Sequence, residues 1–258
     1  MDIKLQDTGF SYGDTQILKS LSCTFSHGRF HAVLGPNGSG KTTLMDLISG
    51  FTPANTGVIS LGESRVSGLS KRKLAQTIAL VSQNYGINFP FTVYEVVLMG
   101  RHPYIDRFSH PSSEDHAKVE EVMSLTGISH LKERKVTELS GGEKQRCIFA
   151  RALCQATPVL LLDEAFSNMD INHTLHLLGL LKKEVKENGK TIVAVLHDLN
   201  LAAGWADSIL FLKRGEIIAQ GDTISVFTSE NIQSVFNIDA KVEFNAYVEA
   251  KQAYFKAS

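Results

Sequence analysis

Residues 35–42 read Gly-Pro-Asn-Gly-Ser-Gly-Lys-Thr and fill every fixed position of the phosphate-binding pattern G-x-x-x-x-G-K-[ST]. The preceding run, residues 30–34, is mostly apolar, as in a buried strand, and residues 43–48 continue as a helix. In such a turn, glycines let successive backbone N–H groups point into one concavity, and the helix N-terminus adds partial positive charge. The sequence therefore predicts an α/β fold with a polyphosphate site at this turn.

Two side chains of this turn have predicted roles. We expect Lys41 to neutralise the β- and γ-phosphates of a nucleotide, and the hydroxyl of Thr42 to ligate Mg²⁺. The remaining contacts with the phosphates are expected from the rest of the turn and the start of the helix, namely Gly35, Pro36, Asn37, Gly38, Ser39, Gly40 and Thr43.

The composition predicts a soluble globular protein. The chain has 258 residues, 43% hydrophobic content and a formal charge of −1, which suits one substantial domain or two small ones. The balanced charge argues against a general nucleic-acid binder, which needs a basic face. Cys23, Cys147 and Cys154 lack metal-binding spacing and indicate reduced, cytosolic thiols. Residues 1–5 contain no apolar signal segment, and no apolar run is long enough to cross a bilayer, so we expect any membrane role to be peripheral.

The N-terminal third of the chain contains short apolar runs of the kind that form β-strands. Alternation around Ile3 and Leu5, and again over residues 21–25, predicts antiparallel strands. Residues 78–81 predict a further strand, and the basic run 70–73 before it predicts a solvated helix start.

Two side chains in this third are candidate ligand contacts. Tyr12 lies in a turn, where an aromatic ring either stacks on an adenine or simply packs on the protein. Gln83 follows the strand 78–81, and the carboxyl ends of strands are where ligands bind in an open α/β sheet.

Helical periodicity replaces the short apolar runs from Thr92 to about Ala150. Val93, Val96 and Val97 recur at helical spacing, and residues 112–115 open another helix with capping residues and acidic charge. The sequence therefore predicts an all-helical segment inserted in an α/β chain.

This segment closes with a second candidate anion site. Ser140, Gly141 and Gly142 stand immediately before a long helix that we expect over residues 143–155. A glycine-rich helix N-terminus of this kind suits an anion. Ordinary N-capping by Ser140 explains the same residues equally well, so both interpretations stay open.

Acidic residues end a buried strand further along the chain. Residues 158–162 are apolar throughout, as in a central parallel strand, and Asp163 and Glu164 follow directly. Asp163 suits a Mg²⁺ ligand, and Glu164 suits the orientation or deprotonation of an attacking water. His197 directly follows the strand 191–196, at the carboxyl end of that strand. Asp163, Glu164, His197 and Gln83 should therefore lie together at one edge of the sheet.

Six motifs in this order resemble those of the ATP-binding-cassette (ABC) ATPases. They are Walker A at 35–42, the Q-loop at Gln83, the LSGGE signature at 139–143, Walker B at 160–164, the D-loop at 167–170 and the H-loop at His197. The resemblance implies an α/β P-loop NTPase core with a mixed sheet, an N-terminal antiparallel β region and an inserted helical subdomain. It also implies a single domain, 1–258, in which 1–86 and 151–258 form the nucleotide-binding core and 87–150 form the helical subdomain.

The family pattern further implies a head-to-tail homodimer with ATP and Mg²⁺ held between Walker A of one subunit and the signature of the other. Ser140, Gly141 and Gly142 would then contact the γ-phosphate bound by the partner's Lys41. The other roles implied by the resemblance are adenine stacking by Tyr12, nucleotide contact by Asp170, sensing of Mg²⁺ and water by Gln83, and a γ-phosphate switch at His197.

Residues 91–104 resemble, more narrowly, the ATPase subunits of importers for iron–siderophore complexes, haem and cobalamin. In that family the segment after the Q-loop receives the permease, so residues 89–101 are the candidate transmission surface. The resemblance implies an ATP-hydrolysing homodimer on the cytoplasmic face of the membrane beneath two permease subunits, served indirectly by a periplasmic or extracellular substrate-binding protein. It implies no nucleic-acid partner.

Two alternatives remain: a soluble ABC ATPase of the iron–sulfur assembly type without a permease, and the ATPase subunit of an exporter. The sequence also departs from the family pattern at Ala165-Phe166 and at Asn168-Met169, where Pro-Thr and Ala-Leu are commoner. Neither change removes a catalytic group. The tail after residue 221 matches no motif and has no predicted role.

Overall fold

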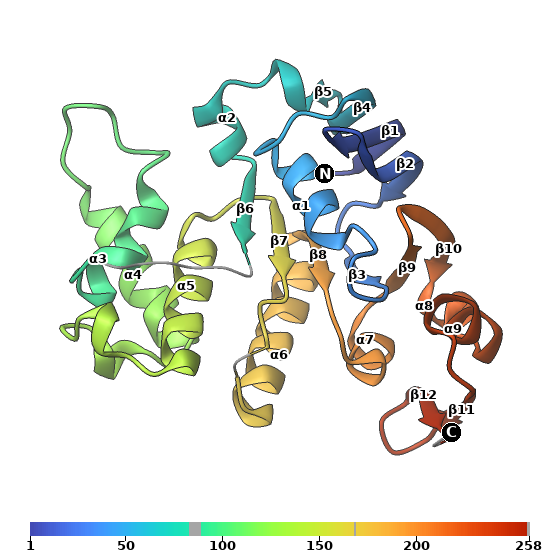
Figure 1. Ribbon diagram of the computed structural model, residues 1–258. Helices are drawn as coiled ribbons and strands as arrows, with labels where there is room; N and C mark the ends of the chain where they lie inside the picture. The colour runs from blue at the N-terminus through green and yellow to red at the C-terminus, as the bar shows by residue number, and fades with distance from the viewer. Residues whose placement is uncertain (83–88, 168, 257–258) are drawn as a thin grey trace.

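A computed structural model describes residues 1–82, 89–167 and 169–256 of the chain (Figure 1). The prediction for Gln83 and the departure at Asn168 therefore lie outside the described residues. The described elements form two main β-sheets, with helices packed on them and a small β-hairpin near the C-terminus.

The larger sheet has six strands in the order β10-β9-β3-β8-β7-β6, and all neighbours are parallel except β9 and β10. Three of its strands, β3, β7 and β8, are buried along their whole length, which explains their nearly continuous apolar sequences. The strands are β3 (Phe30–Leu34), β6 (Ile78–Val81), β7 (Val159–Asp163), β8 (Thr191–Val195), β9 (Ser208–Lys213) and β10 (Glu216–Asp222).

The register of this sheet aligns the carboxyl ends of its strands. Val195 of β8 pairs with Asp163 on one side and with Val33 on the other. Because the chain leaves each strand at this level, the residues that follow β3, β7 and β8 emerge at one edge, as the sequence predicted.

The smaller sheet is antiparallel and confirms the predicted N-terminal β region. Its order is β2-β1-β4-β5, made of β1 (Ile3–Tyr12), β2 (Thr15–Phe25), β4 (Thr56–Leu61) and β5 (Ser64–Arg65). Helix α1 (Lys41–Ser49) shares one hydrophobic core with strands of both sheets, to which it contributes Leu44, Met45, Leu47 and Ile48. This helix therefore carries the end of the phosphate-binding turn on a rigid support.

A second core covers the other face of the large sheet. It joins strand residues such as Leu160 and Leu162 to helices α3 (Val93–Leu98), α4 (Ser113–Leu125), α5 (Gly141–Cys154), α6 (Ile171–Asn188) and α7 (Leu199–Trp205). The 3₁₀ turns η2 (Met99–Arg101), η3 (Ser129–Leu131) and η4 (Val136–Glu138) connect the first three of these helices, and η1 (Val66–Gly68) lies earlier in the chain.

The helix bounds bear on two expectations from the sequence. Ser70 caps α2 (Lys71–Ala75), as the basic run predicted, through a bond from Lys73 N. The boundary expected at residue 150 falls inside α5, which continues to Cys154, so the division into core and helical parts stays a prediction.

The C-terminal tail packs back on the core. It consists of α8 (Thr223–Val226), α9 (Ser229–Phe236) and a hairpin of β11 (Ala240–Asn245) and β12 (Ala250–Phe255), which lies beside α7 (Figure 1). The side-chain amide of Asn200 in α7 makes two hydrogen bonds to the backbone of Ala253 in β12. Its Oδ1 accepts from Ala253 N at 2.7 Å, and its Nδ2 donates to Ala253 O at 3.2 Å.

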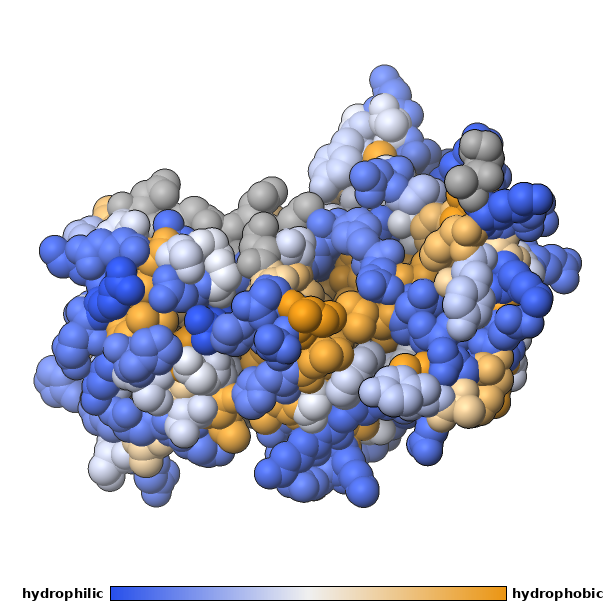
Figure 2. Space-filling view, turned by 90° about the horizontal axis from the view of Figure 1, so that it is seen from below, coloured by the Kyte–Doolittle hydropathy of each residue, from blue (hydrophilic) through white to orange (hydrophobic). Residues whose placement is uncertain are grey.

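The surface carries hydrophobic residues where the sequence did not predict them. Figure 2 shows the lower end of the molecule, where hydrophobic side chains gather toward the centre of a largely hydrophilic face. Ile171 and Leu175 at the N-terminal end of α6 are 59% and 40% exposed. Within the described ranges, no helix is both long and apolar enough to span a membrane.

Candidate active site

Close backbone approach explains one glycine of the phosphate-binding turn, and a left-handed backbone conformation explains another. A Cβ on Gly35 would stand 2.0 Å from the carbonyl oxygen of Leu212 in β9, so only glycine fits between the turn and that strand. Gly40 has a φ of 101°, a left-handed conformation that glycine adopts without strain, and it is the N-cap of α1. These two positions fix the path by which the chain leaves β3 and enters the helix.

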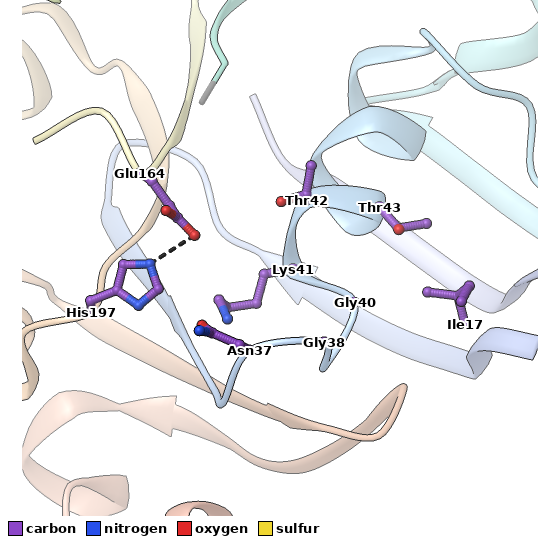
Figure 3. Close-up of a pocket in the computed structure, with 9 residues that line it drawn as sticks. All are labelled: Ile17, Asn37, Gly38, Gly40, Lys41, Thr42, Thr43, Glu164 and His197. Carbon is purple, nitrogen blue, oxygen red and sulfur yellow. Dashed lines mark ion pairs between the residues drawn. The ribbon is translucent and has the colours of Figure 1, made fainter. Parts of the chain in front are cut away.

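The N-terminus of α1 opens into a cavity of about 430 Å³. Gly40 has no side chain to cap the helix, so the first N–H groups of α1 keep their capacity to bind an anion. Figure 3 shows the cavity walls, which come from the turn, from β2 and from the residues after β7 and β8. They are Ile17, Asn37, Gly38, Gly40, Lys41, Thr42, Thr43, Glu164 and His197.

Lys41 is folded back over the turn. Its Nζ donates to the carbonyl oxygens of Gly35 at 2.8 Å and Pro36 at 3.0 Å. Burial lowers the pKa of this ammonium, and the carboxylates of Glu164 and Asp163 act in the opposite direction. A cation in this position is available to an anion that enters the cavity, because the same N–H donors can turn from the carbonyls to the anion.

Asp163 and Thr42 fit a Mg²⁺ site. The hydroxyl of Thr42 lies close enough to the carboxylate of Asp163 to act against the rise in its pKa, and the two side chains together offer an alcohol and an acid suited to a hard cation. Burial raises the pKa of Asp163, and its Oδ1 is buried with no hydrogen-bond partner among the described residues. An orphaned buried carboxylate oxygen is costly unless something positive binds it, so the residues fit the metal predicted for them.

Glu164 reaches the cavity through an unusual backbone turn. It follows the last residue of β7 and has a φ of 53°, which is left-handed and costs about 1–3 kcal/mol for a residue with a Cβ. Its Oε1 lies 2.7 Å from Nε2 of His197, and since a carboxylate only accepts, the imidazole N–H donates. The side chain of Glu164 is 15% exposed and that of His197 is 47% exposed, so the histidine lies on the open side of the pair (Figure 3).

The predicted signature residues lie elsewhere in the same chain. Ser140 is the N-cap of α5, and its Oγ accepts from Glu143 N at 3.3 Å in a complete capping box. None of the described residues that line the cavity comes from α5. Ser140, Gly141 and Gly142 therefore do not complete the cavity within one chain.

Other predicted contacts are also outside the cavity lining. Tyr12, at the end of β1, is 55% exposed and packs edge-on against Phe10 with ring centroids 4.7 Å apart. Asp170 caps α6 by accepting from His173 N at 2.9 Å. Adenine stacking by Tyr12 and nucleotide contact by Asp170 stay predictions.

Ile17 is the lining residue that sequence reasoning missed. It lies on β2 beside Gly40 and Thr43, on the side of the cavity away from Glu164 and His197 (Figure 3). Nothing in the local alternation of β2 distinguishes it, because its place depends on how the antiparallel sheet packs against the turn.

Comparison with known proteins places these features in a family. The family described as "ABC transporter" matches residues 18–167. The cobalamin import ATP-binding protein of Halobacterium salinarum is 38% identical over 88% of this chain, which spans 56% of that relative's length. The iron(3+)-hydroxamate import ATP-binding protein of Bacillus subtilis is 34% identical over 93% of this chain and 89% of its own length.

Solved structures agree with the sequence comparison. An inward-facing ABC transporter classed as metal-chelate type superposes with a TM-score of 0.83 at 29% identity, over 98% of this chain and 96% of that one. A dimeric ATP-binding cassette in a post-hydrolysis state with ADP and Pi superposes with a TM-score of 0.76 at 27% identity, over 86% and 98% of the two chains.

Proposed function

Since the chain belongs to the ABC transporter family, we propose that it is the ATP-hydrolysing subunit of an importer. The observation that carries the proposal is the hydrogen-bonded pair of Glu164 and His197, which faces Lys41 and the N-terminus of α1 across one cavity. This arrangement brings a candidate base, a cation and a set of backbone N–H donors to the same polyphosphate.

Each group has a defined task in this proposal. Lys41 and the turn N–H groups bind and orient the phosphates, and Glu164 orients or deprotonates the attacking water. His197 holds the Glu164 carboxylate on the cavity side through its N–H, and the same N–H can turn from the carboxylate to the γ-phosphate when ATP is bound. Thr42 and Asp163 would hold Mg²⁺, which neutralises charge on the phosphate oxygens when bound.

A second copy of the chain would complete the site. The signature residues lie outside the cavity of their own chain, and a related cassette is dimeric with ADP and Pi bound. We therefore place Ser140, Gly141 and Gly142 of the partner subunit on the γ-phosphate held by Lys41.

The transport role rests on the relatives and on one exposed surface. The relatives are named as importers of cobalamin and iron(3+)-hydroxamate, and a related structure is of metal-chelate type. Residues 89–101 expose Phe89, Phe91 and Met99, with 69%, 39% and 38% of each residue accessible. We propose that this surface meets two permease subunits at the cytoplasmic face of the membrane, and that the cargo is an iron–siderophore complex, haem, cobalamin or a related metal chelate delivered by a separate binding protein.

A mixing experiment tests the composite site. Lys41→Ala removes the phosphate cation, and Gly141→Asp places a negative charge where a partner-bound phosphate would lie. A Cβ at Gly141 meets no atom within 4 Å, and Asp is favoured in the first turn of a helix, so the second variant should fold. Each variant alone should lose ATPase activity, and their mixture should regain part of it because mixed dimers contain one intact site. A mixture as inactive as its components would refute the head-to-tail dimer.

Co-purification separates the importer from its alternatives. Capture of a polytopic permease from membranes, lost when Phe91 and Met99 are replaced by Glu, supports the importer. Capture of soluble iron–sulfur scaffold proteins alone would favour the soluble ATPase, and capture of an export permease would favour the exporter subunit.

A further inference from the structure

The hydroxyl proton of Ser140 is already in use within one chain. Ser140 Oγ donates to Oε2 of Glu143 at 2.7 Å, and Ser140 N donates to the same oxygen at 2.8 Å. A serine hydroxyl has one proton, so it cannot donate to Glu143 and to a phosphate at the same time. The signature serine therefore has two competing acceptors once a nucleotide approaches.

Glu143 is a strong acceptor in this competition. The hydrogen bonds from the hydroxyl and N–H of Ser140 lower the pKa of Glu143, and the nearby Arg134 and Arg146 add to that effect. Arg134 Nη1 lies 3.9 Å from Oε1 of Glu143, the carboxylate oxygen that accepts no hydrogen bond from Ser140. The carboxylate is ionised at neutral pH and presents negative charge beside the place proposed for the γ-phosphate.

The same capping box recurs on two neighbouring helices. Thr92 and Glu95 form it at α3, and Ser112 and Asp115 form it at α4. The repetition shows that the box serves helix initiation in this part of the chain. At α5 alone, the capping serine is also a proposed phosphate ligand.

We propose that Glu143 is a positioning residue that restrains ATP-driven closure of the dimer, because it holds the Ser140 proton that the partner-bound phosphate must attract. This inference rests on the proposed function, since it needs a second copy of the chain across the nucleotide. Closure then requires the hydroxyl to exchange a carboxylate acceptor for a phosphate acceptor, and it brings two negative groups together.

Glu143→Gln weakens both restraints while it keeps the cap. The amide oxygen still accepts from Ser140 N, but a neutral oxygen holds the hydroxyl less strongly than a carboxylate. Gln and Glu have nearly equal helix propensity, so α5 should form as before. We expect the ATP concentration at half-maximal dimerisation to fall by about 3- to 10-fold, the change that a difference of up to about 1.4 kcal/mol produces.

The test uses the full chain carrying Glu164→Gln to slow hydrolysis, with ATP-dependent dimerisation followed by light scattering. Glu138→Gln is the matched control, because it removes one negative charge from an exposed side chain two residues before Ser140. The control should leave the midpoint unchanged. A midpoint that Glu138→Gln lowers as much as Glu143→Gln does would show a general charge effect and overturn the proposal.

A double-mutant cycle shows whether the effect passes through the hydroxyl. In a Ser140→Ala background, Glu143→Gln should shift the midpoint less than it does in the parent, because only the charge restraint is left to remove, and a shift of the same size would overturn the positioning role. Thermal unfolding of each variant separates loss of the cap from loss of the restraint, since a weakened cap lowers stability without tightening the dimer. If the Glu164→Gln parent fails to dimerise with ATP, the proposed function fails; if it dimerises and Glu143→Gln leaves the midpoint unchanged, only this inference fails.

Discussion

Nε2 of His197 lies 2.7 Å from Oε1 of Glu164, so the residue after β8 holds the residue after β7 by a direct hydrogen bond. The two residues are 33 positions apart in the sequence, yet the pairing of Asp163 with Val195 brings their strands to the same level. The bond fixes a carboxylate whose backbone is already in a left-handed turn. Both constraints act on the group that we propose as the base.

Replacing Glu164 by Gln should leave ATP binding intact and lower the turnover by about 10²- to 10⁴-fold, the usual contribution of a positioned general base. The amide keeps the size of the side chain but cannot take a proton. Steady-state ATPase rates and nucleotide titration check the two parts. Glu187→Gln, on the exposed end of α6, is the control and should hydrolyse ATP normally. A Glu164→Gln enzyme with the control's rate would show that the base lies elsewhere.

Replacing His197 by Ala should lower kcat by about 10- to 10²-fold while KM for ATP changes little, because Lys41 and the turn N–H groups still bind the phosphates whereas Glu164 loses its orientation. His197→Gln, which retains an N–H donor, should recover part of the rate. Since His197 is 47% exposed, the free energy of unfolding should change by no more than about 0.5 kcal/mol. Equal rates for the Ala and Gln variants would contradict the role of the hydrogen bond.

The Arg101–Asp115 ion pair should make the helical region acid-sensitive. Nε of Arg101 donates to Asp115 Oδ1 at 2.8 Å, with side chains only 15% and 10% exposed. The hydrogen bond from Arg101 is the main cause that lowers the pKa of Asp115 below its ordinary value of 3.8. A lowered folded-state pKa means that the stabilisation is present above the unfolded value and is lost as pH falls through the folded value.

Asp115→Asn therefore should cost about 3–5 kcal/mol at pH 7, because it leaves the buried Arg101 without its counter-charge. The difference from wild type should begin to shrink as the pH falls below about 3.8, where Asp115 of the unfolded chain takes up a proton, and should continue to shrink through the lower folded-state pKa. Urea denaturation at a series of pH values measures it. The exposed pair Lys118–Glu121 supplies the control, since Glu121→Gln should cost less than about 1 kcal/mol at every pH. A constant difference for Asp115→Asn across the acid range would refute the assignment.

Asn200→Ala should release the C-terminal hairpin from α7. The change removes both bonds to the backbone of Ala253, which is 3% exposed, and leaves its N–H and C=O without these partners. We expect a loss of about 1–3 kcal/mol and faster amide exchange at Ala253 N. Asn188→Ala, which removes one exposed bond to Glu184, should alter neither quantity appreciably. Unchanged exchange at Ala253 in Asn200→Ala would mean that other contacts hold the hairpin.

Sequence patterns predicted the elements of the site better than their contacts. The amphipathic face of α6 shows the limit: helical spacing of Leu175 with Leu178 and Leu181 predicts one apolar face, but Leu175 is 40% exposed, and Thr174 and Leu177 take the buried positions around Leu178 and Leu181. Helical spacing alone fits either residue, because Leu175 lies three positions and Thr174 four positions before Leu178. Which side of α6 meets the sheet is decided by the strands beneath it.

The amino-acid sequence determined, without the fold, the identity of the phosphate-binding turn and of the acids that follow a buried strand. These are local features, because glycine conformation, helix initiation and apolar runs depend on neighbours along the chain. The tertiary structure alone decided that Ile17 lines the cavity, that His197 bonds Glu164, and that Ser140 lies outside the cavity of its own chain. Such contacts join residues far apart in sequence, so they depend on strand register and helix packing, which no local pattern encodes.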